Sequence, residues 1–230
     1  MQIGKSFTYA FEDAKWATKL LLGALIAAVP ILNFAFVGYL VDIIRRVSRN
    51  ELEPLPGWDD LGKKFMDGLI LTIAGLIYAI PLFLFGIPFF GVIFSAAMSG
   101  DADLANSLMA ASAGVGILFG CLAAIYILFL TLFSPAMYVN FARKGNFGAC
   151  FEIGKIIKVA SSNFGNYLLA WLMAIVAGLV IGLVGGILSG LLNFIPCIGQ
   201  ILSWLISAVM SVLIGVVYAH LFGQVSALNT

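Results

Sequence analysis

The sequence predicts an all-α integral membrane protein with four long transmembrane helices, an N-terminal re-entrant or short hairpin, and amphipathic helices at the membrane surface. Its 230 residues are 62% hydrophobic and 10% charged, whereas soluble domains carry about a quarter charged and about half apolar residues. Uncharged runs long enough for a crossing of about 20 residues cover residues 20–41, 68–100, 104–142 and, apart from His220, 159–230. The longest charged stretch, 42–67, is too short for a core of its own, so we expect a single polytopic membrane domain over residues 1–230.

Residues 1–19 are expected to form a helix on the membrane surface. Ile3, Phe7 and Phe11 recur at helical spacing, with charged residues on the opposite side. Trp16 is a residue type enriched at the depth of the lipid headgroups. This pattern is typical of an amphipathic interfacial helix.

Residues 20–41 admit two interpretations. Pro30 and Asn33 interrupt the run near its middle, which favours a hairpin with two limbs that are each too short to cross. The alternative is a single Pro-kinked span, which would place the three N-terminal lysines on the opposite side from all other basic residues. We expect the hairpin because it keeps all 12 basic residues on one side.

Residues 42–67 are expected to form a crossover loop whose charge sets the topology. Basic residues favour the cytoplasmic side of short loops, and five of the 12 lie in this loop while four lie in residues 143–158. The connections at 101–103 and 193–200 contain none. We therefore expect the protein in the cytoplasmic (inner) membrane, with both basic loops, the N-terminus and the C-terminus in the cytoplasm.

Residues 68–100 and 104–142 are longer than a straight crossing needs. At about 1.5 Å per residue, either helix would exceed a hydrocarbon core of about 30 Å. Three prolines are the expected break points: Pro81, Pro88 and Pro135. The later run also carries small residues at every fourth position, which lets helix backbones approach closely: Ser112, Gly116 and Gly120.

Residues 143–162 are expected to form a second surface helix that repeats the first. Four residues recur 140 positions later, where Phe7, Phe11, Glu12 and Lys15 match Phe147, Phe151, Glu152 and Lys155. A Leu-Asn-Phe sequence also occurs twice, around Asn33 and around Asn193. These matches favour a degenerate two-fold repeat of a surface helix followed by a hairpin. The alternative is that any amphipathic surface helix produces similar spacing.

Residues 163–192 and 200–224 are the last two expected spans. Asn193 and Pro196 mark a turn between them, because proline ends a helix. The first of these spans has a glycine at every fourth position, a glycine zipper: Gly178, Gly182, Gly186 and Gly190. Helix association in lipid depends on close approach, so we expect this face to meet another helix of the same chain, or a partner or second copy.

The sequence contains no recognisable catalytic or metal-binding motif. Three cysteines without a Cys-x-x-Cys pair and a single histidine do not suggest a metal site, and we expect no cofactor. No Asp, Glu, Lys or Arg lies within the expected spans, although proton and ion pathways usually need an ionisable residue there. Asn33, Asn140 and Asn193 are expected to cap broken helices, and His220 to be an interfacial side chain. We expect neither an enzyme nor, at a net charge of +1, a nucleic-acid binder.

The crossover loop carries the most distinctive motif of the chain. Trp58 can anchor at headgroup level, and Asp59 or Asp60 can cap the helix that follows. The motif elements are Gly38-Tyr39, Arg45-Arg46, Leu55-Pro56-Gly57-Trp58-Asp59-Asp60 and Phe65-Met66-Asp67-Gly68. Together they resemble the domain of unknown function 4013 family, uncharacterised prokaryotic polytopic membrane proteins, over most of the chain. The resemblance implies an integral membrane protein and supplies no established activity or cofactor.

Two functions are consistent with these features. The concentration of charge on one face favours a non-enzymatic membrane scaffold or accessory subunit that presents its cytoplasmic loop to a partner. The broken helices and the repeat favour, as the alternative, a transporter or organiser of lipid or small apolar solute. The expected partners are membrane lipids and either a protein partner or a homo-oligomer in the membrane.

Overall fold

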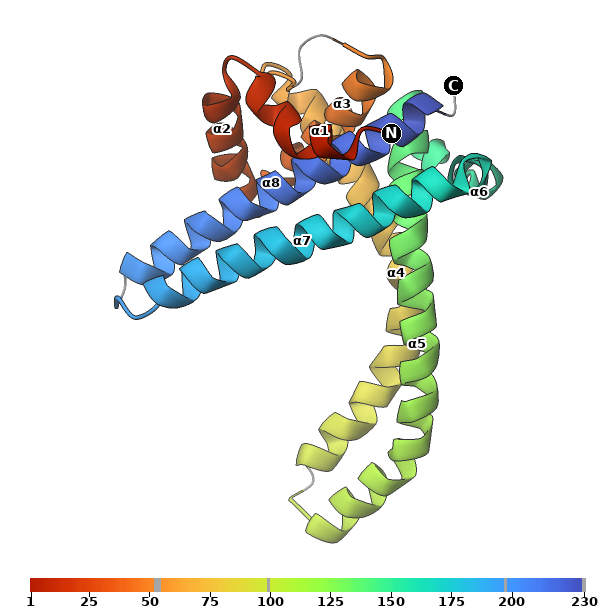
Figure 1. The fold of residues 1–230 in the computed structure, drawn as a ribbon. Helices are drawn as coiled ribbons and strands as arrows, with labels where there is room; N and C mark the ends of the chain where they lie inside the picture. Colours follow the sequence, from red (N-terminus) through yellow and green to blue (C-terminus); the bar gives the residue numbers. More distant parts are fainter. Residues whose placement is uncertain (52–54, 99, 197, 229–230) are drawn as a thin grey trace. The chain divides into compact units, whose positions relative to one another are not determined.

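The computed structural model describes residues 1–51, 55–98, 100–196 and 198–228, and these residues form helices and no strands (Figure 1). The elements are α1 (Ile3–Thr8), η1 (Tyr9–Glu12), α2 (Trp16–Ala28), α3 (Asn33–Ser48), α4 (Leu61–Met98), α5 (Ala102–Lys144), η2 (Phe147–Phe151), α6 (Ile153–Ser162), α7 (Phe164–Leu192) and α8 (Ile198–Leu228). Four helices contain stretches long and apolar enough to cross a membrane: Leu61–Leu84, Gly116–Lys144, Phe164–Leu192 and Ile198–Leu228. The prediction of an all-α membrane protein with four long apolar helices is confirmed.

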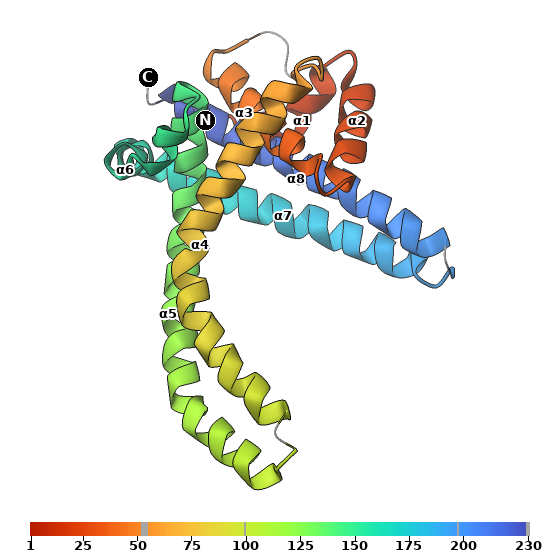
Figure 2. The same cartoon turned by 180° about the vertical axis from the view of Figure 1, so that it is seen from behind.

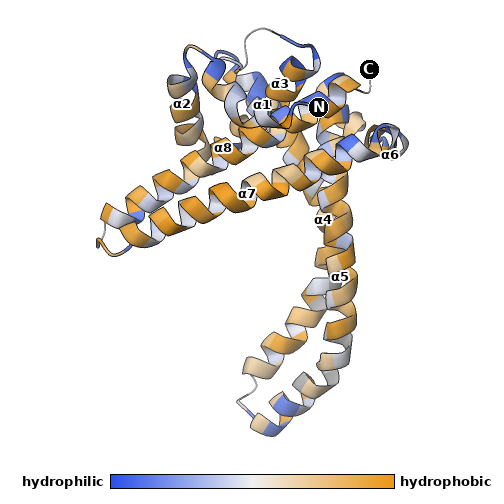
Figure 3. Cartoon of the chain, in the orientation of Figure 1, coloured by the Kyte–Doolittle hydropathy of each residue, from blue (hydrophilic) through white to orange (hydrophobic). Residues whose placement is uncertain are grey.

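The chain divides into two compact units. The first contains Met1–Thr72 and Pro135–Thr230, and the second contains Ile73–Ser134. The helices α4 and α5 each contribute to both. Within the first unit, α7 and α8 are largely hydrophobic, whereas hydrophilic residues gather around α1 and the segment that follows α3 (Figure 3).

Residues 20–41 take the hairpin form. The run divides into α2 and α3, with a turn over residues 29–32 that contains Pro30. The turn closes where the Asn33 N–H donates to the Val29 carbonyl at 2.9 Å. Both helices are shorter than the ~20 residues of a crossing. They contact each other, and both contact α8, as the opposite views of Figures 1 and 2 also show.

Close backbone approach between α3 and α4 requires glycine at two positions. A Cβ on Gly38 would overlap the Lys64 carbonyl, and a Cβ on Gly68 would overlap the Phe34 carbonyl. The helices therefore cross at a contact that no larger residue permits. On another side of α3, Phe36 and Leu40 pack over Gly215 of α8.

The crossover is shorter than expected from the charge distribution. Because α3 continues to Ser48 and α4 begins at Leu61, many charged residues of 42–67 lie on helix ends rather than in a loop. The N-terminal segment is likewise divided: α1 ends at Thr8 and η1 at Glu12, and the backbone of the next residue, Asp13, is extended with φ −77° and ψ 128°. Trp16, expected in the surface helix, is the first residue of α2.

The helix α6 presents three different faces. Ile156 and Val159 are buried, whereas Ile153 and Ile157 are about half exposed, at 52% and 51%. Lys155 is exposed on a third side. A helix with one face on protein, one apolar face exposed and one charged face suits the boundary between lipid and water.

The structure differs from expectation at three prolines. The helix α4 continues through Pro81 and Pro88, and α5 continues through Pro135. A proline removes one amide donor, but its φ is already helical, and a full break inside lipid would leave more backbone groups without hydrogen bonds. Breaks do occur in both hairpin turns, where Pro30 and Pro196 lie between helices.

The second unit is a hairpin of the later part of α4 and the earlier part of α5. Gly116 lies against the ring of Phe89, which a Cβ would approach to 2.6 Å. The Tyr126 hydroxyl donates to the Tyr78 carbonyl at 2.8 Å. Ring contacts, including Tyr78 with Phe133 at 5.2 Å, complete the contact between the two helices.

Candidate functional site

The largest concentration of charge in the first unit lines a cleft of about 490 Å³. Seven basic and five acidic residues surround it, from the end of α3, the segment that follows, the start of α4 and the end of α5. We call this feature the polar cleft. Its acidic and basic residues include the motif positions Arg45, Arg46, Asp59 and Asp60.

A buried ion-pair network forms the floor of the polar cleft. Arg45 Nη1 lies 2.9 Å from Asp42 Oδ1 and 2.6 Å from Asp67 Oδ2. Lys64 Nζ lies 3.2 Å from Asp42 Oδ2, and Arg45 Nε donates to the Ala142 carbonyl at 3.0 Å. The network joins α3, α4 and α5. Because its charges are paired with one another, it positions the helix ends and leaves little capacity for an external ligand.

The charges on the rim of the polar cleft are less closely paired than those of its floor. Arg46 and Arg49 lie 3.6 Å and 3.9 Å from the Glu51 carboxylate, which are long contacts; Arg49 and Glu51 are exposed and Arg46 is half-buried. Asp59, Asp60 and Lys63 are exposed, and within the described residues no ion pair or side-chain hydrogen bond involves them. As far as the described residues show, the rim therefore offers unpaired charges of both signs at Asp59, Asp60 and Lys63.

The motif residues Leu55 and Trp58 fasten the crossover segment to the hairpin. Asp13 Oδ2 accepts from the Leu55 N–H at 3.3 Å, and Lys19 Nζ donates to the Leu55 carbonyl at 2.7 Å. Trp58 Nε1 donates to the Lys19 carbonyl at 2.9 Å and its ring stacks on Tyr39 at 4.2 Å. We call these five residues the crossover clasp. Its motif positions hold the fold together and are not exposed for binding.

The pKa of Asp13 reflects this role. Burial alone would raise the pKa of the carboxyl group, but hydrogen bonds from Lys19 and from the backbone N–H groups of Lys15 and Leu55 outweigh it. The pKa of Asp13 therefore lies below its ordinary value. The carboxylate stays ionised at neutral pH and keeps the clasp closed.

The end of α5 is tied to the elements that follow it. Arg143 donates to the Ser226 side chain at 3.1 Å and to its carbonyl at 2.7 Å. Glu152 accepts from Lys144 at 2.7 Å, and Asn140 donates to the Ala149 carbonyl at 2.8 Å. Asn140, one of the polar candidates from the sequence, thus makes structural contacts with the turn that precedes α6.

A second pocket of about 490 Å³ lies between the N-terminal segment and α8. His220 lines it but is only 4% exposed. Its Nδ1 lies 2.9 Å from Ser6 Oγ and 3.1 Å from Gln224 Nε2, and its ring stacks on Tyr9 at 4.2 Å. Sequence analysis missed this cluster because Ser6 and His220 are 214 residues apart.

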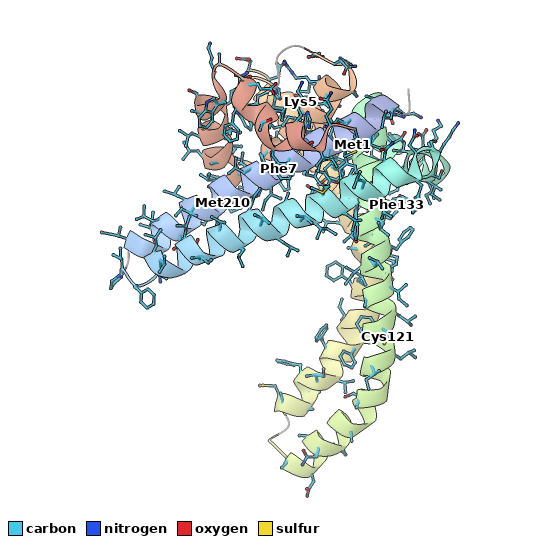
Figure 4. The ribbon with its side chains drawn as sticks, in the orientation of Figure 1. Met1, Lys5, Phe7, Cys121, Phe133 and Met210 are labelled. Carbon is cyan, nitrogen blue, oxygen red and sulfur yellow. The ribbon has the colours of Figure 1, made fainter. Side chains whose placement is uncertain are left out.

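The predicted glycine zipper faces open space in the structure. Among the described residues, nothing lies within 4 Å of a Cβ built at any of the four positions: Gly178, Gly182, Gly186 and Gly190. The neighbouring Gly185 is the packed glycine of α7, since a Cβ there would come within 2.7 Å of Met210, which Figure 4 labels on α8. Within this unit, α7 therefore packs on α8 through Gly185 and not through the glycine zipper as expected. Contact of the zipper with a partner or a second copy stays a prediction.

The remaining small residues and asparagines that the sequence predicts as site residues lie in different parts of the fold. In α5, Gly116 meets Phe89 whereas Gly120 is open. Asn193 accepts a hydrogen bond from Ser203 at 3.2 Å across the α7–α8 turn, and Asn33 is exposed as the first residue of α3. The structure does not bring Asn33 and Asn193 together around one site.

The second unit contains an apolar groove of about 1030 Å³ between α4 and α5. Its lining includes Pro81, Phe89, Ser112, Leu122 and Tyr126. We call it the apolar groove. The groove can accommodate hydrocarbon, but neither of the asparagines expected around a transported solute contributes to it.

In the described part of the chain, no three His, Cys, Asp or Glu residues are arranged to hold a metal ion. The chemistry that the described residues offer is ion pairing at the polar cleft, hydrogen bonding around His220, and burial of hydrocarbon in the apolar groove.

Comparison with known proteins gives a family and no individual relative. A family model described as "Protein of unknown function (DUF4013)" matches residues 21–190, which is more than half of the chain. The matched range includes the crossover clasp motif and the polar cleft residues of α3, α4 and α5. Neither a curated protein nor a solved structure matches the sequence.

Proposed function

The chain belongs to the DUF4013 family of proteins of unknown function, and on this premise we propose that it is a non-enzymatic membrane scaffold or accessory subunit that presents the polar cleft to a partner protein. The observation that carries the proposal is the contrast between floor and rim. The floor is a fixed ion-pair network around Arg45, whereas Asp59, Asp60 and Lys63 on the rim are exposed and unpaired within the described residues.

This contrast suits docking of a protein surface. Rim charges of both signs give electrostatic complementarity, which sets partner choice and orientation. The network beneath them holds α3, α4 and α5 in one arrangement, so little reorganisation is needed on binding. The crossover clasp adds to this rigidity, because it fastens the segment before the rim to α2 and α3.

The test is recovery of a partner in mild detergent. The tagged protein should retain a stoichiometric protein partner, and the triple variant Asp59→Lys, Asp60→Lys, Lys63→Glu should lose at least about 10-fold of it, since rim charge reversal opposes docking. Lys158→Glu is the matched control, because Lys158 is an exposed lysine of α6 outside the cleft. A monomer without partners in the wild-type preparation would contradict the proposal, as would equal recovery from the triple variant and the control.

A second candidate function is organisation or transport of a lipid or small apolar solute, and the apolar groove is the observation in its favour. Leu122→Trp should fill the groove and reduce co-purified lipid, measured by native mass spectrometry. Ile117→Trp is the control, because Ile117 is 71% exposed on the same helix and does not line the groove. Unchanged lipid in the Leu122→Trp protein would remove the support for this function.

A further inference from the structure

The N-terminal segment is attached to α8 by a set of polar contacts that includes one histidine. The Gln2 N–H donates to Gln224 Oε1 at 2.6 Å, and Gln224 Nε2 donates to the Gln2 carbonyl at 3.2 Å. Ser6 Oγ lies 2.9 Å from His220 Nδ1. Figures 1 and 4 show α1 with Lys5 and Phe7 beside α8.

These contacts favour a neutral His220 whose Nδ1 is an acceptor. A backbone N–H can only donate, so the donor at Gln2 fixes the oxygen of the Gln224 amide toward it. The Gln224 NH2 group must then face His220 Nδ1, at 3.1 Å. An NH2 group only donates, and its two hydrogens have three neighbours, which are the Gln2 carbonyl at 3.2 Å, Ser6 Oγ at 3.2 Å and His220 Nδ1. When Nδ1 accepts one of them, the neutral ring carries its proton on Nε2.

Protonation of His220 opposes this arrangement. A proton on Nδ1 would remove one acceptor from the Gln224 NH2 group and would make Ser6 Oγ the acceptor for both side chains. It would also add charge to a side chain that is only 4% exposed. Three cationic groups share its pocket: Lys5, Arg46 and the amino terminus at Met1. The other titratable groups there are one phenol and two carboxylates: Tyr9, Glu12 and Glu51. Arg46 and Glu51 pair with each other at 3.6 Å, and among the described residues no acid lies within ion-pair distance of the ring.

We propose that His220, Gln224, Ser6 and Gln2 form a protonation-sensitive latch, which holds the N-terminal segment on α8 while His220 is neutral and releases it on acidification. Arg46 and Glu51 line both this pocket and the polar cleft. Release of the segment would therefore expose one side of the cleft rim. The latch does not depend on the proposed function, because its immediate effect is on the position of α1 and η1.

The latch can be tested by the mobility of a nitroxide spin label on the N-terminal segment. The label is placed at Gly4→Cys, since a Cβ there meets nothing within 4 Å, in the full chain with its native cysteines replaced by serine. Spectra are recorded in detergent between about pH 8 and about pH 4, which spans histidine titration. The label at Gly165→Cys, also an open glycine, reports general effects of acid.

Two variants give the experiment opposite expected results. His220→Asn keeps an acceptor at the position of Nδ1 that cannot be protonated, so the label should stay immobile across the pH range. Gln224→Glu replaces the donor by a carboxylate that favours protonated His220, so its label should be more mobile at neutral pH than in acid. Thr8→Ala, a change at an exposed residue of the same segment, should behave as wild type.

In the wild type we expect the immobile component to dominate at neutral pH and a mobile component to dominate in acid, with no change at Gly165→Cys. A wild-type spectrum that does not change would overturn the latch. So would a mobile component that appears at the same pH in His220→Asn, because another group would then cause it.

Discussion

At the scale of single residues, Trp58 makes two contacts that can be separated. Its ring stacks on Tyr39 at 4.2 Å and its Nε1–H donates to the Lys19 carbonyl at 2.9 Å. Trp58→Phe keeps a ring but removes the donor, so we expect the free energy of unfolding to fall by about 1 kcal/mol. Trp58→Ala also removes the stacked ring, and the loss should rise to about 2–4 kcal/mol. Unfolding in mild detergent measures both losses.

Trp204 supplies the matched control for this prediction. Its side chain is 51% exposed, and within the described residues it makes no hydrogen bond or ring contact. Trp204→Phe should leave the unfolding transition in place. Similar losses in Trp58→Phe and Trp204→Phe would show that the Lys19 contact adds no stability.

Glu152 should make the region around α6 sensitive to acid. Hydrogen bonds from Lys144, Asn140 and Lys155 lower its pKa from 4.5 to about 2. Since the pKa in the folded state lies below the unfolded value, the stabilisation is complete above about pH 4.5 and is lost as the pH falls toward about 2. Glu152→Gln should therefore weaken the decline of the thermal midpoint in this window.

The comparison for Glu152 is another exposed glutamate. Glu12→Gln removes a carboxylate from a residue with no ion pair among the described contacts, so its acid profile should follow wild type. If Glu152→Gln declines with the same slope as wild type between about pH 4.5 and about pH 2, the pairing of Glu152 does not stabilise the fold.

The sequence identifies the motif at 55–60 but does not reveal what it contacts. Proline, glycine, tryptophan and aspartate in a short segment predict a turn at the membrane surface, and that local reading is independent of the rest of the chain. The contacts of Leu55 and Trp58 are with Asp13 and Lys19, more than 30 residues earlier. In the sequence, Asp13 and Lys19 are part of an amphipathic pattern that predicts only a surface helix. Their contacts with Leu55 and Trp58 can be identified only from the folded structure.

At the scale of helices, the crossing of α3 and α4 depends on Gly38. A Cβ there would overlap the Lys64 carbonyl, and the backbone can relieve this only by separation of the helices. We expect Gly38→Ala to destabilise the protein by about 1–3 kcal/mol. Gly62→Ala is the control on α4, because its Cβ meets nothing within 4 Å, and it should be neutral or stabilising by up to about 1 kcal/mol. Chemical unfolding of the two variants should give opposite signs, and two equal losses would contradict the close crossing.

The glycines of α7 make a similar comparison possible. Gly182 and Gly186 are open, whereas a Cβ at Gly185 would clash with Met210. We expect Gly185→Leu to disrupt the α7–α8 hairpin, and the double variant Gly182→Leu, Gly186→Leu to retain the fold of a single chain. Size-exclusion chromatography distinguishes the outcomes. Loss of a wild-type oligomer in the double variant alone would assign the zipper to contact between copies, while loss of the folded monomer would contradict its open position.

Helix boundaries could be predicted where a turn is encoded by several residues together. Pro30 with Asn33, and Asn193 with Pro196, each combine a helix breaker with a capping residue, and both turns form. Pro81 and Pro135 have no asparagine within three residues, and the helices continue through them. A lone proline costs one hydrogen bond, whereas a turn in lipid exposes several backbone groups, and this difference in cost is not apparent from residue type alone.

At the scale of the whole molecule, hydropathy predicts the spans because insertion into lipid depends on apolar content averaged over about 20 residues. A polar contact between distant segments depends on two residues that are far apart in the sequence. A single sequence contains no pattern that shows which two residues will meet. His220 with Ser6 and Arg143 with Ser226 are both contacts of this kind. The sequence thus predicts that charge gathers at one end of the helices, and the structure adds which charges bind each other and which remain on the rim.

These long-range contacts predict a topology. Asp13 binds Leu55, Gln2 binds Gln224, and Arg143 binds Ser226, so we expect the N-terminal segment, the crossover, the end of α5 and the end of α8 to share one side of the membrane. Four crossings by α4, α5, α7 and α8 satisfy this condition only if the α2–α3 hairpin returns to the side from which it enters.

The shared side should be the cytoplasm. All 12 basic residues lie within residues 5–19, 45–64 and 143–158, and the connections around residues 101 and 195 have none, which is the distribution that orients membrane proteins. Reporters active on only one side should therefore give cytoplasmic signals at the N-terminus, at Asn50 and at the C-terminus, and an external signal at Asp101. An external N-terminus with an internal C-terminus would require α2 and α3 to cross as one span. The contacts of Asp13 with Leu55 and of Gln2 with Gln224 could then not form, so this single result would contradict both the topology and the packing of the N-terminal segment.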